Sequence, residues 1–226
     1  EAVLAALGLP RGWQKRLARA FGSPEMIAAA LADLANPPAS GVLADRVAAL
    51  AAAGDRAALA AHVAAEMDVA GLSRSAGRTP DEIARRLLEK TELARVRLPE
   101  AALRALRGFL AIHVPLNQAV ETLDSFARAS GIDLGAALDT FSARAAAMSG
   151  HGLEPDAISY DAAFGRPLDY YTGLVFEITA EGSPRVLAGG GRFDRLLTLL
   201  GAEKPIPGVG FSVWLDRIEA LRETRP

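Results

Sequence analysis

The distribution of alanine is the feature that most constrains the fold of this chain. Residues 1–150 contain 40 alanines, whereas residues 151–226 contain only 7. Alanine is the strongest helix former and is depleted in strands. We therefore predict an α+β protein, with a mainly helical region over 1–150 followed by a region of strands and helices over 151–226.

Two helix starts in the first region are marked by local sequence. Ser23 is followed by a proline and an early carboxylate, and Thr79 is followed by Pro80 and by Glu82 at the capping-box position. Further helices are predicted over about 100–111, 116–129 and 134–148, and the alanine-rich stretch 43–67 is predicted to be helical. The first helical pattern begins at Glu1 without a cap, which indicates a piece of a longer chain.

Apolar stripes predict which of these helices share a core. One stripe lies on the helix after Pro99 and the other on the helix after Pro115, and we expect them to pack on each other. The two stripes are Leu103, Leu106 and Leu110, and Leu116, Val120 and Leu123.

From about residue 156 the pattern changes to short runs of aromatic and β-branched residues between turns. These runs are AISYDAAF, GLVFEITA, RVLAGG and IPGVGFSV. Because short turns separate them, they favour antiparallel pairing. We predict one antiparallel sheet within about 157–213, packed on helices over 191–200 and 214–222.

Composition excludes several kinds of site and partner. The chain has no Cys, and its three His (His62, His113 and His151) are far apart in sequence, so we expect no metal site. We predict no cofactor either. With 25 basic and 27 acidic residues the net charge is −2, which does not favour nucleic acid. Charges interrupt every apolar run, so no membrane association is expected and the protein is predicted to be cytoplasmic.

The segment from Gly165 to Gly173 concentrates polar groups before a predicted strand. Arg166, Asp169, Tyr170 and Tyr171 lie within six positions. A guanidinium can bind a carboxylate, a carboxylate can bind an ammonium, and a phenol can bind a ring edge, so the segment can hold a small zwitterion. Alternatively, it is a turn with a structural Arg–Asp pair and two half-buried tyrosines.

Two further segments carry unusual residues. Gly189, Gly190 and Gly191 precede a predicted helix, where their amides could receive an anion, although a tight strand-to-helix junction explains them equally well. After the last strand come Trp214, Asp216 and Arg217. Asp216 suits the helix dipole, but the dipole does not explain Arg217.

Together the three segments resemble histidyl-tRNA synthetases. RPLDYYTGLVFE resembles their histidine motif, GGGRFDRLLTLLG their glycine-rich element, and PGVGFSVWLDRIEAL motif 3 of class II synthetases, whose arginine contacts ATP. The resemblance implies a class II aminoacyl-tRNA synthetase-like antiparallel sheet with helices, preceded by an all-helical insertion lobe. Residues 151–226 would then be the motif 3 half of the core.

The departures from that family concern its nucleotide site. Pro167 replaces a glycine, Asp216 replaces a glutamate, and Trp214 replaces a small glycine beside the adenine. An indole buries on the order of 200 Å² and would compete with adenine for space. Trp214, Asp216 and Arg217 are therefore interpreted as a vestigial nucleotide site. The anticodon-binding domain expected after motif 3 is also missing from this sequence.

With these departures the chain resembles the regulatory subunits of ATP phosphoribosyltransferase. That resemblance implies a non-catalytic partner of the short-form catalytic subunit in a hetero-octamer, which acts in the first step of histidine biosynthesis and in its feedback inhibition. It implies no catalytic residues. The implied histidine-binding residues are Arg166, Asp169, Tyr170, Tyr171, Gly189 and Gly190. The alternative is a fragment of a histidyl-tRNA synthetase that activates histidine with ATP and charges tRNA.

Overall fold

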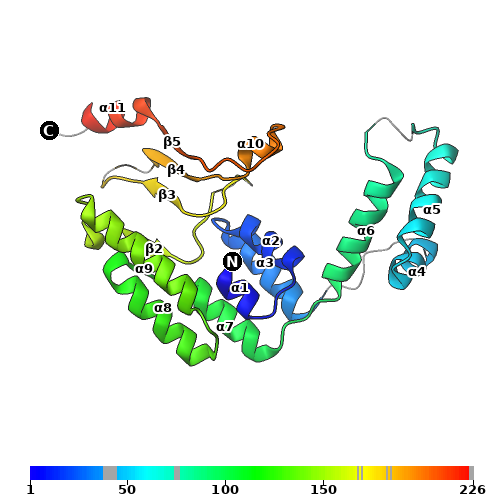
Figure 1. The fold of residues 1–226 in the computed structure, drawn as a ribbon, viewed down its shortest axis with the longest axis horizontal. Helices are drawn as coiled ribbons and strands as arrows, with labels where there is room; N and C mark the ends of the chain where they lie inside the picture. Colours follow the sequence, from blue (N-terminus) through cyan, green and yellow to red (C-terminus); the bar gives the residue numbers. More distant parts are fainter. Residues whose placement is uncertain are drawn as a thin grey trace. The chain divides into compact units, whose positions relative to one another are not determined.

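The computed structural model divides the chain into two compact units, Glu1–Phe164 and Gly165–Pro226. It describes residues 1–37, 45–73, 77–166, 168, 170–181, 183 and 185–223. The first unit is mainly helical and the second contains a small sheet (Figure 1). The chain is thus α+β, as predicted. That the family's insertion ends near residue 150 stays a prediction.

Helices account for more than two thirds of residues 1–150. No helix among the described residues is long and apolar enough to cross a bilayer. The helices of the first unit are α1 (Ala2–Ala6), α2 (Arg11–Ala20), α3 (Pro24–Ala35), α4 (Asp45–Ala53), α5 (Arg56–Val69), α6 (Pro80–Ala94), α7 (Glu100–Leu110), α8 (Leu116–Ser130) and α9 (Gly135–Gly150).

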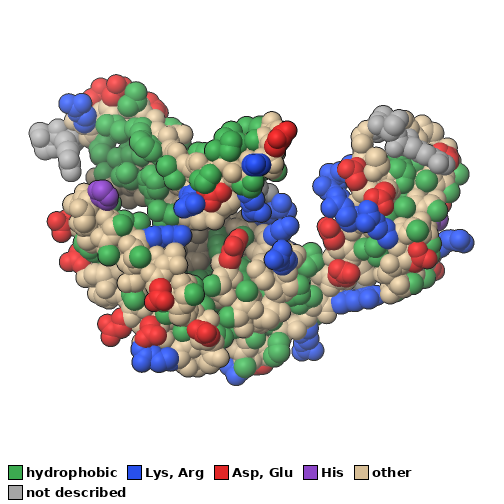
Figure 2. All heavy atoms as spheres, in the orientation of Figure 1, with side chains coloured by type: hydrophobic (Ala, Val, Ile, Leu, Met, Phe, Trp, Pro, Cys, Tyr) green, Lys and Arg blue, Asp and Glu red, His purple; other side chains and the backbone are tan. Residues whose placement is uncertain are grey.

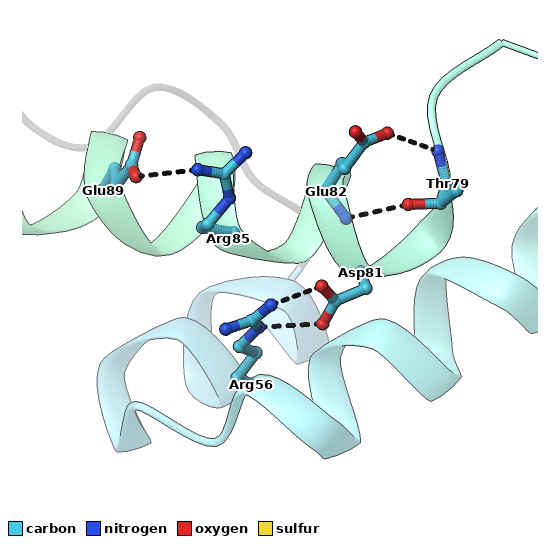
Figure 3. Close-up of polar contacts among 6 residues, drawn as sticks. All are labelled: Arg56, Thr79, Asp81, Glu82, Arg85 and Glu89. Atoms are coloured by element: carbon cyan, nitrogen blue, oxygen red, sulfur yellow. Dashed lines mark hydrogen bonds and ion pairs between the residues drawn. The ribbon is translucent and has the colours of Figure 1, made fainter. Parts of the chain in front are cut away.

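Both helix starts that the sequence marks are confirmed. Ser23 caps α3 by accepting a hydrogen bond from the backbone of Met26. At α6 the Glu82 amide donates to Thr79 Oγ1 over 3.3 Å, and the Thr79 amide donates to Glu82 Oε2 over 2.9 Å, which completes a capping box (Figure 3). The Thr79 backbone hydrogen bond also lowers the pKa of Glu82. Arg56 on α5 pairs with Asp81 on α6 beside this cap.

The predicted helical stretch 43–67 is interrupted at Gly54. Its described part forms α4 and α5, and Gly54 between them has a φ of +70°, which favours glycine. Asp55 then caps α5 by accepting from the amide of Ala58. The alanine composition is compatible with one long helix, and only these two residues mark the break.

Among the described residues, three apolar clusters form the core of the first unit, and they confirm the predicted pairing of the leucine stripes only in part. Leu110 packs against the cluster that contains Leu123. Leu103 and Leu106 of α7 lie in one cluster with residues of α1–α3, including Trp13. Phe109 of α7 and Leu123 of α8 lie in another. Helix α7 therefore divides its apolar side chains between two neighbours, whereas the sequence pattern suggested one. A third cluster, smaller than these, joins α4, α5 and α6.

A short strand, β1 (His113–Pro115), lies within the region predicted to be all-helical. It pairs antiparallel with β2 (Ser159–Asp161), so the first predicted strand after residue 156 belongs to the first unit and not to the larger sheet. Val114 is β-branched and precedes a proline, and both properties favour extended backbone over helix. The prediction of one sheet over 157–213 was wrong in this respect.

The second unit contains a three-stranded antiparallel sheet in the order β3-β4-β5. The strands are β3 (Val175–Ile178), β4 (Ala188–Arg192) and β5 (Val209–Val213), followed by α11 (Leu215–Glu223). The helix predicted over 191–200 is reduced to α10 (Leu196–Leu199). The first residues of the predicted helix are not helical, because Arg192 is the last residue of β4 and the Phe193 amide donates to the Gly208 carbonyl over 2.8 Å.

The two faces of this sheet differ in character. Side chains alternate along a strand, so Glu177, Gly189 and Gly191 share one face. The opposite face carries large apolar side chains that are exposed: Ile178, Val209, Phe211 and Val213. Figure 2 shows hydrophobic side chains gathered over this part of the chain. Arg166 and Tyr171 cover the face that carries Gly189 and Gly191.

Candidate functional site

Arg166 lies directly on the glycine strand β4. A Cβ atom built on Gly189 would come within 2.1 Å of Arg166 Nη1 and 2.9 Å of its Cζ. Only a residue without a side chain leaves the space that the guanidinium occupies. The Arg166 side chain is consequently only 11% exposed. Its charge is held close to the sheet and away from bulk water.

The guanidinium has an ionic neighbour but unused donors. Glu177 of β3 places Oε1 3.6 Å from Arg166 Nε, which is an ion pair without a hydrogen bond. Arg166 Nε and Nη1 are buried and have no hydrogen-bond partner among the described residues. Buried donors without partners cost free energy, and a ligand oxygen would satisfy them. Arg166 is therefore suited to bind a carboxylate.

The Tyr171 ring packs against β4 at Gly191, two residues further along the strand than Gly189. A Cβ atom on Gly191 would come within 2.9 Å of the Tyr171 ring. The Tyr171 and Tyr170 ring centroids are 4.6 Å apart, and Tyr170 meets Phe193 edge-on at 5.8 Å. Desolvation, followed by the hydrogen bond with Tyr170, raises the pKa of Tyr171. Its phenol thus stays protonated at neutral pH and can donate or accept a hydrogen bond.

Gly189, Gly190 and Gly191 do not precede a helix, although the sequence pattern predicted that they would. They lie within the central strand and not at a helix N-terminus, and β4 pairs with β3 on one side and with β5 on the other. Their backbone groups therefore serve the sheet, and an anion site built from their amides is not formed. A Cβ atom on Gly190 would come within 2.2 Å of the Gly210 carbonyl oxygen. The glycines instead permit close packing on both faces.

The Trp214 ring lies near two arginines, Arg166 and Arg217. The Arg217 guanidinium carbon is 4.6 Å from the Trp214 ring centroid, and that of Arg166 is 5.9 Å away. Arg217 Nη1 also donates to the Val186 carbonyl over 2.6 Å. Arg217 is therefore held by a backbone acceptor and an aromatic face, and both would compete with a phosphate for it.

The structure brings some of the predicted site residues together and separates others. Arg166 and Tyr171 lie over Gly189 and Gly191, whereas Gly190 directs its free side to the opposite face. The Tyr170 ring packs beside that of Tyr171 in a tilted arrangement. Asp216 lies in the first turn of α11. Asp169 and Pro167 lie outside the described residues.

Two residues of this cluster were not selected from the sequence. Glu177 is the final residue of the RPLDYYTGLVFE segment, and its place opposite Gly189 becomes visible only with the strand register. Phe193 packs against Gly208 and Gly210. It was not selected because its segment was expected to be helical. A group of three or more potential metal ligands is absent from the residues that the structure describes.

Comparisons with known proteins show the family of the chain. A family model described as histidyl-tRNA synthetase matches residues 83–218, more than half of the chain. The chain belongs to the histidyl-tRNA synthetase family and has its class II synthetase-like fold.

The curated relatives carry a more particular name. A protein of Mesorhizobium japonicum named ATP phosphoribosyltransferase regulatory subunit is 66% identical over 226 residues, which is 100% of this chain and 61% of that protein. Proteins of the same name from a Chelativorans species and from Sinorhizobium fredii are 61% and 57% identical, and the chain covers 61% and 59% of them. The chain spans about three fifths of the length of these relatives.

A solved structure was also found. The crystal structure of a histidine–tRNA ligase subunit from Alicyclobacillus acidocaldarius aligns with 98% of this chain and 50% of that one, at 23% identity and with a TM-score of 0.43.

Proposed function

We propose that this chain forms part of a non-catalytic regulatory subunit of ATP phosphoribosyltransferase. In this role it would act in the cytoplasm, with the short-form catalytic subunit in a hetero-octamer, in the first step of histidine biosynthesis. The observation that carries the proposal is the 66% identity, over the whole of this chain, to a relative of that name. No metal, cofactor or nucleic acid enters the proposed role.

The motif 3 region supports a non-catalytic role. A synthetase arginine at the position of Arg217 must be free to contact ATP, but here it donates to Val186 and stacks on Trp214. The indole of Trp214 adds bulk on the order of 200 Å² of surface where the family has a glycine. Both features oppose nucleotide binding, which disfavours the alternative of a histidyl-tRNA synthetase fragment.

The cluster on β4 supports histidine as the ligand. Arg166 would receive the carboxylate through its unused donors, and Tyr171 would meet the imidazole edge. Gly189 provides the space for Arg166, whereas Gly190 would contribute only by holding β5 close. Tyr170 would position Tyr171, and Asp169 remains a proposed ligand for the ammonium. Feedback inhibition by histidine would then be sensed at this site.

The direct test uses the full-length protein with and without the short-form catalytic subunit. We expect phosphoribosyl-ATP formation to require both proteins and to be inhibited by histidine. We also expect the full-length protein alone to show no histidine-dependent exchange between ATP and pyrophosphate. Such exchange would contradict the regulatory role and favour the synthetase alternative.

Two substitutions test the histidine site within the assembled complex. Arg166→Ala and Tyr171→Phe should each raise the histidine concentration needed for inhibition by about tenfold to a hundredfold, because each removes a proposed polar contact to the ligand. Assembly should be unaffected. Arg195→Ala, which removes an exposed arginine of the same unit, is the matched control. Unchanged inhibition in both variants would mean that histidine is sensed elsewhere.

A further inference from the structure

Glu177 is the one acidic side chain that the structure records in contact with Arg166 among the described residues. It lies on β3 directly opposite Gly189, on the face of the sheet that Arg166 covers. The Glu177 side chain is 29% exposed, against 11% for Arg166. The carboxylate is therefore the more accessible of the two charged groups.

The geometry separates charge compensation from hydrogen bonding. A guanidinium withdrawn from water requires a nearby negative charge, and Glu177 supplies it at 3.6 Å. At that distance the carboxylate leaves Arg166 Nε and Nη1 without acceptors. The Arg166–Glu177 pair thus has one compensated charge and, among the described residues, two guanidinium nitrogens without acceptors.

These two properties distinguish between classes of ligand. A simple carboxylate bound to Arg166 would place a second negative charge beside Glu177, and the two would repel each other. A ligand with an ammonium next to its carboxylate would satisfy both residues, because the cation can bind Glu177 while the anion binds Arg166. The pair is complementary to a zwitterion.

We propose that Glu177 is a specificity-determining residue that selects an α-amino acid over the corresponding acid without the amino group. This inference rests on the proposed histidine site and identifies a residue for its ammonium group besides Asp169. Under this proposal, removing the Glu177 charge weakens histidine binding. If Glu177 only competed with the ligand for Arg166, removing its charge would strengthen histidine binding.

The test compares two ligands by calorimetry on the full-length protein. The ligands are histidine and imidazole-4-propionate, which lacks only the amino group. We expect the unmodified protein to prefer histidine by about tenfold or more, and Glu177→Gln to reduce this preference by about tenfold. Histidine should bind the variant more weakly, whereas imidazole-4-propionate should bind equally well or better. Glu181→Gln, an exposed residue of the same unit, controls for the change in net charge.

Each other outcome overturns the inference. An unchanged preference in Glu177→Gln would mean that Glu177 only neutralises Arg166. Equal tightening of both ligands would mean that it competes with them. If the unmodified protein binds neither ligand but still activates the catalytic subunit, the specificity inference fails while the regulatory role stands. If the unmodified full-length protein does not activate the catalytic subunit, the proposed function itself is contradicted.

Discussion

At the scale of single residues, the glycines of β4 differ in what a side chain would meet. At Gly189 the added Cβ would meet the end of the flexible Arg166 side chain, and at Gly190 it would meet the backbone carbonyl of Gly210 and the Cα of Phe211. A flexible side chain can move aside at small cost, whereas a paired strand cannot. Neighbouring glycines thus serve the site and the fold separately.

This difference predicts two phenotypes. Gly189→Ala should displace Arg166 and weaken histidine binding by about tenfold, with less than about 1 kcal/mol lost in the free energy of unfolding. Gly190→Ala should destabilise the protein by about 1–3 kcal/mol, because β5 must shift. Chemical denaturation and calorimetry on both variants measure the two effects. Equal loss of stability in the two would contradict the assignment.

The ionisation of Tyr160 on β2 should make the free energy of unfolding depend on pH. Burial, with a smaller contribution from Asp161, raises the pKa of Tyr160 to about 12. The unfolded phenol ionises near pH 10, so the unfolded state loses its proton first and the free energy of unfolding falls as the pH rises from about 10 to about 12.

We expect this fall to amount to about 2 kcal/mol and to be smaller in Tyr160→Phe. Phenylalanine keeps the edge-on contact with Phe141, at 5.1 Å between centroids, so stability near neutral pH should change little. Urea denaturation at several alkaline pH values measures the slope in both proteins. Identical slopes would show that Tyr160 ionises as freely in the folded protein as in the unfolded one.

At the scale of elements, two glycines in the helical unit have opposite roles. Gly54 separates α4 from α5 with a φ of +70°, whereas Gly108 lies inside α7 with helical backbone. An added Cβ has nothing within 4 Å at either position. Any effect of alanine at these positions therefore comes from the backbone and not from packing.

Alanine should consequently change stability in opposite directions. Gly54→Ala should cost about 1–2 kcal/mol, because a Cβ is disfavoured in the left-handed region. Gly108→Ala should stabilise by about 0.5–1 kcal/mol, because glycine inside a helix is unfavourable. Thermal or urea denaturation followed by circular dichroism measures both. Stabilisation by Gly54→Ala would mean that α4 and α5 can join into one helix.

At the scale of the whole molecule, the apolar core is distributed unevenly between the units. The three apolar clusters recorded for the described residues all lie within Glu1–Phe164. In the second unit the sheet instead exposes Ile178, Val209, Phe211 and Val213 on one face. An exposed apolar sheet face is a liability for an isolated domain.

We therefore expect residues 1–164 to fold when produced alone and residues 165–226 to aggregate when produced alone. The first fragment should unfold cooperatively on heating and retain a helical circular dichroism spectrum. Size-exclusion chromatography distinguishes the two behaviours. A monomeric, cooperatively folding second fragment would contradict the prediction, as would a first fragment without a thermal transition.

Features that depend on interactions between residues close in sequence were predictable from the sequence. The capping box of Thr79 and Glu82 was predictable because its hydrogen bonds span three residues and depend on side-chain chemistry alone. The strands β3, β4 and β5 were predictable from local β-branched and glycine patterns. The cluster of Arg166 and Tyr171 against the glycine segment was anticipated from the resemblance to a known motif.

Tertiary structure decided the remaining features, because each depends on partners distant in sequence. Strand β2 pairs with β1, 46 positions earlier between Val114 and Tyr160, and no local pattern specifies that choice. Helix α7 divides its apolar side chains between two clusters for the same reason. Glu177 faces Arg166 only through the register of β3 on β4. The sequence by itself thus determined most of the helices and strands and the motif, whereas long-range packing decided which charge faces Arg166.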